Sequence, residues 1–234
     1  MPFKITDNVS NIIVSKQTLT IENQELKKEL FLLKARLQQY DIIEAENHRL
    51  RDLLESSFRL KNKVLVAQPV AIQLDSFQKK IVINKGKSDG GYEGQPILDS
   101  SGIMGQITQI NPFSSTVLLI IDPNHAIPVQ INRNGLRARA VGSGEDELLV
   151  LEHLPKPLIT DPNLPNKAHV VIGDLIVTSG LGRRFPRDYP VGEVQEIIQI
   201  PGELSGRVIV KPFAQFGKIR EVLMVWPNEY RNTD

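Results

Sequence analysis

The sequence predicts a mainly β protein with one long N-terminal α-helix, arranged as a coiled coil followed by two small β-barrels. Residues 18–62 contain neither proline nor glycine and place apolar residues at helical spacing. Residues 63–227 instead hold short runs rich in Val, Ile and Leu, separated by Gly, Pro, Asn and Asp, which is typical of strands and turns. With 41% hydrophobic and 24% charged residues, the chain can fill a core of this kind.

Residues 1–17 form a polar lead that contains Asn and Ser, and we expect it to be flexible or extended. Its start has neither the basic flank nor the apolar run of a signal peptide. No window approaches the roughly 18 consecutive apolar residues of a membrane-spanning helix. The sequence therefore predicts no membrane span, although the chain can be a fragment of an anchored protein.

Residues 18–62 are rich in Leu, Glu, Lys, Arg and Gln, which lose little side-chain freedom in a helix. Their apolar stripe advances in steps of three and four, broken by one three-three step from Tyr40 to Ile43 that would locally overwind a coiled coil. The stripe is narrower than a core-facing helix shows, so we expect two copies to pair through it; a single helix lying on the downstream domain is the alternative. Two asparagines at a positions favour a two-stranded, in-register pairing. The predicted dimerisation residues are Leu19, Asn23, Leu26, Leu30, Leu33, Leu37, Tyr40, Ile43, Asn47, Leu50 and Leu54.

The remaining residues predict strands at close spacing, as in antiparallel barrels or sandwiches. A length of about 170 residues favours two small barrels over one large one. We expect the first barrel at residues 63–110, completed by C-terminal strands within 195–227, and the second at residues 111–194. Residues 228–234 are expected to be a short tail.

Composition excludes several classes of function. The 28 basic and 27 acidic residues create no field for nucleic acid, and the arginines of residues 133–139 alternate with apolar residues, as on a strand with one wet face. The absence of cysteine excludes disulfides and thiolate metal sites, and four scattered histidines lack metal-ligand spacing. Gly86-Lys-Ser88 lacks the upstream glycine and the following helix of a phosphate-binding loop. No cofactor and no metal are expected.

Serine catalysis is the enzymatic alternative. Two barrels with a serine late in the chain are typical of chymotrypsin-like proteases, so Ser179 is a candidate nucleophile, with His125 and Asp122 as possible partners. Ser179 lies in Thr-Ser-Gly rather than Gly-Asp-Ser-Gly, and the spacing of Asp122 and His125 equally suits a turn. The residues favour a turn between strands. The arginines of the same loop could bind an anion, or could simply be solvated.

The order of several motifs is more specific than any one of them. Residues 45–54 lead into residues 84–97, followed by residues 102–107, 119–129 and 173–182, and the set closes with Phe185-Pro and Pro190-Val-Gly-Glu-Val. Together these motifs resemble MreC, the bacterial rod shape-determining protein family. The positions that carry the resemblance are Gly86, Asp89, Gly90, Gly94, Gly105, Asp122, Pro123, Pro128, Gly173, Asp174, Thr178, Ser179, Gly180, Gly182, Phe185, Pro186, Pro190 and Gly192.

The resemblance implies a scaffold without enzyme activity, whose two barrels have a chymotrypsin-like arrangement but no working triad. It implies a homodimer or filament that contacts MreD, the elongation-specific penicillin-binding transpeptidase and, indirectly, the actin-like MreB. It also implies a place at the periplasmic face of the bacterial inner membrane, with a single-pass anchor upstream of this chain. A filament that activates no enzyme is the alternative within the same family.

Partner contacts are expected from exposed aromatic or charged side chains, although core placement would suit the aromatic ones equally well. Arg183, Arg184 and Asp188 stand where the family usually has small residues. The candidate contacts are Tyr92, Phe113, Phe185, Tyr189, Arg183 and Arg184.

Overall fold

The computed structural model describes residues 5–60, 62–75, 78–144, 146–152, 154, 169–198 and 207–227. The chain divides into two compact units, Met1–Arg51 and Asp52–Asp234, which are described separately below. The expected tail at 228–234 lies outside the described residues. Among the helices so described, none is both long enough and apolar enough to cross a bilayer.

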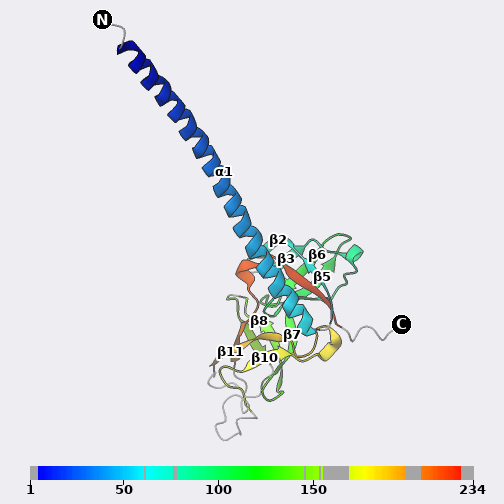
Figure 1. Cartoon of the computed structure of the whole chain (residues 1–234). Helices are drawn as coiled ribbons and strands as arrows, with labels where there is room; N and C mark the ends of the chain where they lie inside the picture. Colours follow the sequence, from blue (N-terminus) through cyan, green and yellow to red (C-terminus); the bar gives the residue numbers. More distant parts are fainter. Residues whose placement is uncertain are drawn as a thin grey trace. The chain divides into compact units, whose positions relative to one another are not determined.

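The N-terminal element is one helix, α1 (Ile5–Leu60), of 56 residues (Figure 1). The expectation of a flexible or extended lead over residues 1–17 is therefore wrong for residues 5–17. These residues contain no proline or glycine, and their β-branched side chains lower helix propensity only slightly, so nothing stops the helix from extending towards the N-terminus.

The first sheet is antiparallel and contains seven strands, in the order β1-β13-β4-β5-β6-β3-β2. We call it the half-barrel. Its two end strands, β1 and β2, follow one another in the chain and are separated only by Gln68, so the sheet curls until its two edges meet in one bent strand. The strands are β1 (Lys63–Ala67), β2 (Pro69–Leu74), β3 (Lys79–Ile83), β4 (Pro96–Leu98), β5 (Ile103–Ile110), β6 (Ser115–Leu119) and β13 (Val222–Trp226).

The second sheet is a closed antiparallel barrel, in the order β10-β11-β12-β9-β8-β7. Its strands are β7 (Ala126–Ile131), β8 (Arg137–Gly142), β9 (Leu149–Glu152), β10 (Leu175–Thr178), β11 (Pro190–Ile198) and β12 (Arg207–Pro212). Short 3-10 turns lie at η1 (Lys87–Asp89), η2 (Leu181–Arg183) and η3 (Phe216–Lys218). The fold class predicted from the sequence, a long helix followed by mainly β structure in two barrel-like sheets, is confirmed.

The predicted division between the two sheets needs two corrections. Strand β6 belongs to the half-barrel although it lies beyond residue 110. Strands β11 and β12 belong to the closed barrel, so β13 is the only described strand within residues 195–227 that joins the first sheet. The reason is that strand pairing is non-local: β12 has the alternating buried pattern that either sheet could use, and the pattern does not identify the neighbours.

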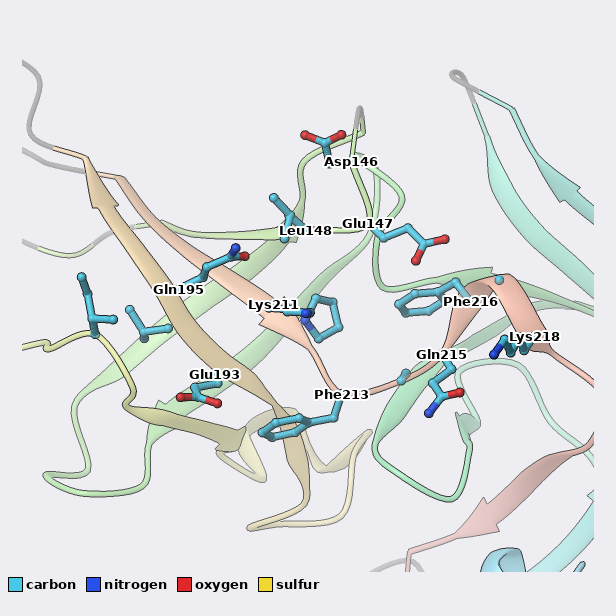
Figure 2. A pocket seen from close by; sticks show the side chains of 15 residues that line it. Asp146, Glu147, Leu148, Glu193, Gln195, Lys211, Phe213, Gln215, Phe216 and Lys218 are labelled. Atoms are coloured by element: carbon cyan, nitrogen blue, oxygen red, sulfur yellow. The ribbon is translucent and has the colours of Figure 1, made fainter. Parts of the chain in front are cut away.

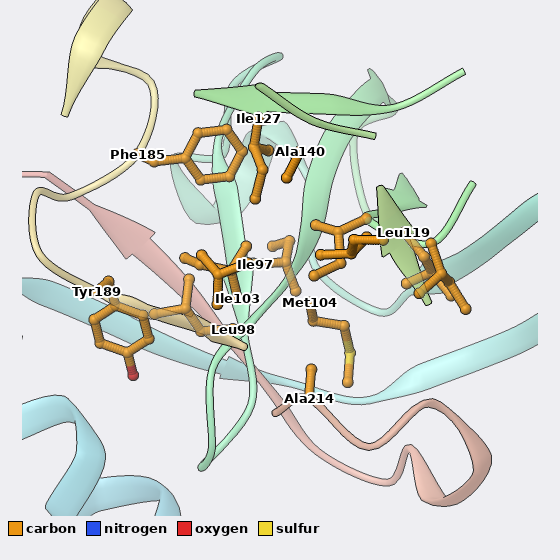
Figure 3. Packing of buried hydrophobic residues seen from close by; sticks show 14 of the residues in the cluster. Ile97, Leu98, Ile103, Met104, Leu119, Ile127, Ala140, Phe185, Tyr189 and Ala214 are labelled. Atoms are coloured by element: carbon orange, nitrogen blue, oxygen red, sulfur yellow. The ribbon is translucent and has the colours of Figure 1, made fainter. Parts of the chain in front are cut away.

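Both sheets share one hydrophobic core (Figure 3). Ile97 and Ile103 of the half-barrel belong to the same buried cluster as Ile127 and Ala140 of the closed barrel, and each of the four is at most 1% exposed. Alternate residues of β3 and β7 are buried, as the two-residue period of a strand requires. Because the core is continuous, the loops that join the sheets are held by packing from both sides.

Candidate functional site

The loop that follows β10 is organised by Thr178, which is fully buried. Its hydroxyl donates a hydrogen bond to the carbonyl oxygen of Pro186 and accepts one from the backbone N–H of Tyr189 at 2.9 Å. Backbone bonds close the loop further: the N–H of Thr178 donates to the carbonyl of Tyr189 at 2.8 Å, and the N–H of Asp188 donates to the carbonyl of Thr178 at 2.9 Å. Residues 179–189 therefore form a closed turn rather than an open anion-binding loop.

Two positions in this turn have a left-handed backbone. Gly180 has φ +70°, and a Cβ there would lie 3.0 Å from the Cβ of Arg187. Among the described residues, Asp188 is the one non-glycine residue with a positive φ, at +58°. Aspartate tolerates this left-handed region better than most side chains do. Its carboxylate accepts a hydrogen bond from Nε2 of Gln130 at 2.9 Å. Asp188 thus ties the turn to β7.

Ser179 is held by the backbone of β7. Its Oγ donates a hydrogen bond to the carbonyl oxygen of Pro128 at 3.1 Å and accepts one from the N–H of Leu181 at 3.3 Å. The side chain is 6% exposed. The hydroxyl proton therefore points to a carbonyl rather than to any base among the described residues.

His125 is buried beside the same loop, with 4% exposure. Its ring meets Phe185 edge to face at 6.3 Å between centroids, and neither ring nitrogen has a hydrogen-bond partner among the described residues. Burial lowers the pKa of His125 from 6.5 to about 4, against the opposing charge of Asp122. The imidazole is neutral at physiological pH and packs as an apolar ring.

Asp122 forms a turn rather than a pair with His125. One carboxylate oxygen accepts from the backbone N–H of Lys79 at 2.7 Å, and the other accepts from the N–H of Asn124 at 2.8 Å. The residue's own carbonyl accepts from the N–H of His125 at 3.0 Å. Ser179, His125 and Asp122 are thus held by other groups, and no hydrogen bond joins any two of them.

The predicted partner contacts separate into two groups. Phe185 and Tyr189 are 3% and 7% exposed and belong to the shared core, so their prediction as surface contacts is wrong (Figure 3). The sequence pattern could not distinguish them because an aromatic residue beside a turn suits either place. Phe113, at 77% exposure in the turn between β5 and β6, is a surface aromatic. Tyr92 is half-buried and Arg184 is exposed, whereas the Arg183 side chain lies outside the described set.

The ion pair between Arg133 and Asp174 was not predicted from the sequence. Arg133 donates to both carboxylate oxygens of Asp174, from Nε at 2.7 Å and from Nη2 at 2.8 Å. Nη2 also donates to the carbonyl of His169, and the N–H of Val171 donates to Asp174. The pair clamps residues 169–174 onto the turn between β7 and β8. Its only sequence signal was the Gly173-Asp174 motif, which does not reveal an arginine 41 residues upstream.

The other motif residues build turns and strand ends. At Gly86 an added Cβ would lie 2.3 Å from the carbonyl oxygen of Asn111, because the two turns pack directly together. Asp89 closes this turn by accepting a hydrogen bond from the N–H of Gly86 at 3.0 Å, and this bond, with Lys85 at 3.2 Å, lowers the pKa of Asp89. The remaining positions lie in similar turns or in the strands beside them: Gly90, Gly94, Gly105, Pro123, Pro128, Gly173, Gly182, Pro190 and Gly192.

The predicted coiled-coil stripe is exposed along α1. Leu26, Leu30, Leu33 and Leu37 expose between 51% and 63% of their surface. Leu19 lies in the helix but its side chain is outside the described set, and Leu50 is half-buried, whereas the other predicted positions are exposed: Asn23, Tyr40, Ile43, Asn47 and Leu54. Three exposed apolar residues, Phe31, Leu32 and Ile42, lie off the stripe.

The C-terminal unit, Asp52–Asp234, which we call the barrel unit, also carries a cleft of about 1060 Å³ beside β11 and β12 (Figure 2). Phe213 and Phe216, on the segment that leads from β12 to β13, line it with Leu148. Glu193 and Lys211, which are cross-strand neighbours, also line it. This volume is at the upper end of the range of ligand sites.

The fold and these sites define a class of protein in which a long helix precedes two barrel-like sheets. Its residues that resemble a catalytic triad have structural roles in turns. The family model described as "Rod shape-determining protein MreC, barrel core" matches residues 70–226. The chain belongs to the MreC family, which confirms the resemblance found in the sequence.

Relatives support the same assignment. The cell shape-determining proteins MreC of Haemophilus influenzae and Escherichia coli are 38% and 36% identical, over 97% and 96% of this chain and 62% and 59% of their own lengths. The crystal structure of MreC from Pseudomonas aeruginosa is 43% identical, covers 70% of this chain and 100% of its own, and has a TM-score of 0.62. The chain thus spans about three fifths of the curated relatives' length.

Proposed function

We propose that this chain is a non-catalytic scaffold that pairs through α1 and presents its barrel unit to a penicillin-binding transpeptidase of cell-wall elongation. The observation that carries the proposal is the exposed apolar stripe of α1, which we call the seam, and which includes Leu26, Leu30, Leu33 and Leu37. The chain's membership in a family of cell shape-determining proteins supports it. The arrangement of Ser179, whose hydroxyl donates to a carbonyl rather than to a base, supports a role without catalysis.

The seam favours pairing with a second copy. Burying a leucine stabilises an assembly by about 1.5–3 kcal/mol, and four adjacent seam leucines are more than half exposed in the single chain. The asparagines Asn23 and Asn47 at a positions would set the register at some cost in stability.

Binding to the transpeptidase would activate it only if the barrel unit binds the active state more tightly than the inactive one. Pairing through α1 raises the local concentration of the barrel units and so strengthens such binding. Phe113 and the cleft beside β11 and β12 are the candidate contact surfaces. MreD, and indirectly MreB, complete the proposed assembly at the periplasmic face of the inner membrane, with the anchor upstream of this chain.

Sedimentation equilibrium of the Leu33→Glu variant tests the pairing. A seam glutamate places two like charges in the interface, so we expect the mass to fall from dimer to monomer at concentrations where the parent chain is dimeric. Leu32→Glu is the matched control, because Leu32 is equally exposed but lies off the stripe. A parent chain that is monomeric at every concentration, or equal behaviour of both variants, would contradict pairing through this seam.

Calorimetric titration with the cognate transpeptidase ectodomain tests the partner. We expect binding in the micromolar range or tighter, and weakening by about tenfold in Phe113→Ala if that aromatic is an anchor. Ser179→Ala should bind like the parent, and a serine-hydrolase probe should label neither chain. Absence of binding argues against the scaffold, while labelling that Ser179→Ala abolishes would restore the hydrolase alternative.

A further inference from the structure

Two arginine motifs that lie far apart in the sequence share one face of the closed barrel. Arg137 and Arg139 belong to β8, whereas Arg184 and Arg187 belong to the turn after β10. All four side chains are exposed, and none of Arg137, Arg139 and Arg184 takes part in an ion pair among the described residues. We call these four residues the arginine face.

Strand β7 sets the distance between the two motifs. It pairs with β8 on one side and with β10 on the other, so that Gln130 lies opposite both Arg137 and Val177. Neighbouring strands are about 4.8 Å apart, which separates β8 from β10 by about 10 Å. Arg137 and Arg139 are two residues apart on one strand, so both point outwards at a spacing of about 7 Å. One partner can therefore contact arginines of both motifs.

The turn is fixed to this face by hydrogen bonds to β7. Nε2 of Gln130 donates to the carboxylate of Asp188 at 2.9 Å. The N–H and the hydroxyl of Ser179 both donate to the carbonyl oxygen of Pro128, each at 3.1 Å. The backbone that carries the arginines of the turn is thus held in place before a partner arrives, which lowers the entropy cost of binding.

The arginine face carries a surplus of positive charge. Its four arginines stand with two carboxylates, those of Asp188 and of Glu152, which lies opposite Arg139, so two positive charges are left over. The whole chain has a net charge of only +1. Positive charge is therefore concentrated here rather than spread over the chain, and such a surface attracts anionic groups.

We propose that the arginine face docks an acidic surface of a partner protein. A guanidinium binds a carboxylate through two parallel hydrogen bonds, and side chains on paired strands present these groups at fixed spacing. Surfaces that bind anionic lipid add apolar side chains that insert beside the cations. Among the described residues of β7, β8 and the turn, Leu181 is the one large apolar side chain that is exposed, at 46%. The chemistry of this face thus favours a protein over a membrane.

The proposal goes beyond the function proposed above and does not depend on it. The arginine face shares no residue with the seam of α1, with Phe113 or with the cleft beside β11 and β12. Opposite charges on two partners speed their encounter, and salt screens this attraction. Binding through the arginine face should therefore weaken as the salt concentration rises.

Fluorescence anisotropy with a labelled peptide of eight glutamates tests the face in low-salt buffer. We expect the parent chain to bind, and the variant that combines Arg137→Glu with Arg187→Glu to bind about tenfold more weakly. The matched control combines Lys218→Glu with Arg220→Glu, which changes the net charge equally at two other exposed cations. The control should bind like the parent chain. Absence of binding by the parent, or equal weakening in both double variants, would overturn the proposal.

Asp188→Asn provides a test that a folding defect cannot imitate. The substitution removes a carboxylate from the face and keeps an oxygen that can accept from Gln130, so peptide binding should tighten about twofold. Urea unfolding followed by the fluorescence of Trp226 checks that every variant is folded. Weaker binding by a folded Asp188→Asn chain would contradict the role of the surplus charge.

Vesicles distinguish a protein partner from a lipid. Cosedimentation in the same buffer uses equal parts of phosphatidylglycerol and phosphatidylcholine. We expect the variant that combines Arg137→Glu with Arg187→Glu to pellet with the vesicles to the same extent as the parent chain. Vesicle binding that this variant abolishes would assign the arginine face to lipid headgroups and overturn the choice of an acidic protein.

Discussion

At the scale of single residues, the protein places polar side chains that resemble catalytic ones into structural roles. Thr178 closes a loop and Asp122 closes a turn, and both are fully buried. His125 differs, because neither of its ring nitrogens has a hydrogen-bond partner in the part of the chain that the structure describes. A buried polar group without a partner costs free energy, and for a histidine that cost depends on pH.

We expect stability to fall between pH 6.5 and pH 4. The unfolded chain protonates His125 near its ordinary pKa of 6.5, whereas the folded chain resists protonation down to about 4, so the unfolded state binds the proton first as pH falls. From pH 7.5 to pH 5 this removes about 2 kcal/mol. Urea unfolding of the parent chain and of His125→Leu at both pH values measures the effect, which the variant should lack.

His48→Leu is the control for this experiment, because it removes an exposed histidine of α1 and leaves the buried His125 in place. Comparing variants also removes contributions from other titrating groups, such as Asp99, whose pKa is raised by burial. An unchanged pH dependence in His125→Leu would contradict the assignment of a neutral, buried ring.

The Arg133–Asp174 pair should be worth more than a surface ion pair. Asp174→Asn removes the charge from a side chain that is 3% exposed and accepts several hydrogen bonds, so we expect a loss of about 2 kcal/mol in the free energy of unfolding. Asp188→Asn is the comparison, since its pair with Arg187 spans 3.7 Å between largely exposed side chains and should contribute less than about 0.5 kcal/mol. Equal losses of unfolding free energy in the two variants would show that the Arg133–Asp174 pair contributes no more than a surface ion pair.

At the scale of elements, the bend between β1 and β2 decides the shape of the half-barrel. Asn84 holds it from two sides: its Oδ1 accepts from the N–H of Gln68 at 2.8 Å, and its own N–H donates to the carbonyl of Gln68 at 3.0 Å. One residue thus satisfies both main-chain groups at the point where the strand leaves one edge of the sheet for the other.

Asn84→Ala should cost about 1 kcal/mol of unfolding free energy, because it removes the side-chain half of this clamp. Asn111→Ala is the control, since its amide reaches Ser114 only at 3.5 Å. Denaturant titration distinguishes the two. If both variants unfold like the parent chain, the side chain of Asn84 does not stabilise the bend.

At the scale of the whole molecule, the chain consists of two compact units, so we expect them to unfold separately. Trp226, the single tryptophan, lies in β13, donates a hydrogen bond to Gly90 and packs under Lys63, so its fluorescence reports on the barrel unit. Far-ultraviolet circular dichroism at 222 nm reports mainly on α1. Leu33→Glu should lower the melting temperature of the helix signal and leave that of Trp226 unchanged; a common shift would indicate one cooperative unit.

Prediction from sequence succeeded where the signal is local. The absence of proline and glycine predicted the helix, but its extension to Ile5 was missed. The polar composition of residues 5–17 suggested a flexible lead, yet such residues also form a helix when no proline or glycine interrupts them. Runs such as residues 126–131 predicted strands by their β-branched content. The candidate site was predicted less well: Phe185 and Tyr189 carry no local mark of burial, and the carbonyl that accepts from the hydroxyl of Ser179 belongs to Pro128, 51 residues upstream.

The sequence by itself determined the long helix, the β-rich remainder, the turn positions and the family, since propensity, spacing and motif order are properties of neighbouring residues. The tertiary structure alone decided which strands share a sheet, that Arg133 clamps Asp174, and that the hydroxyl of Ser179 points to a carbonyl. These features depend on contacts between residues tens of positions apart, and a pattern that repeats every two or four residues contains no information about which distant partner completes it.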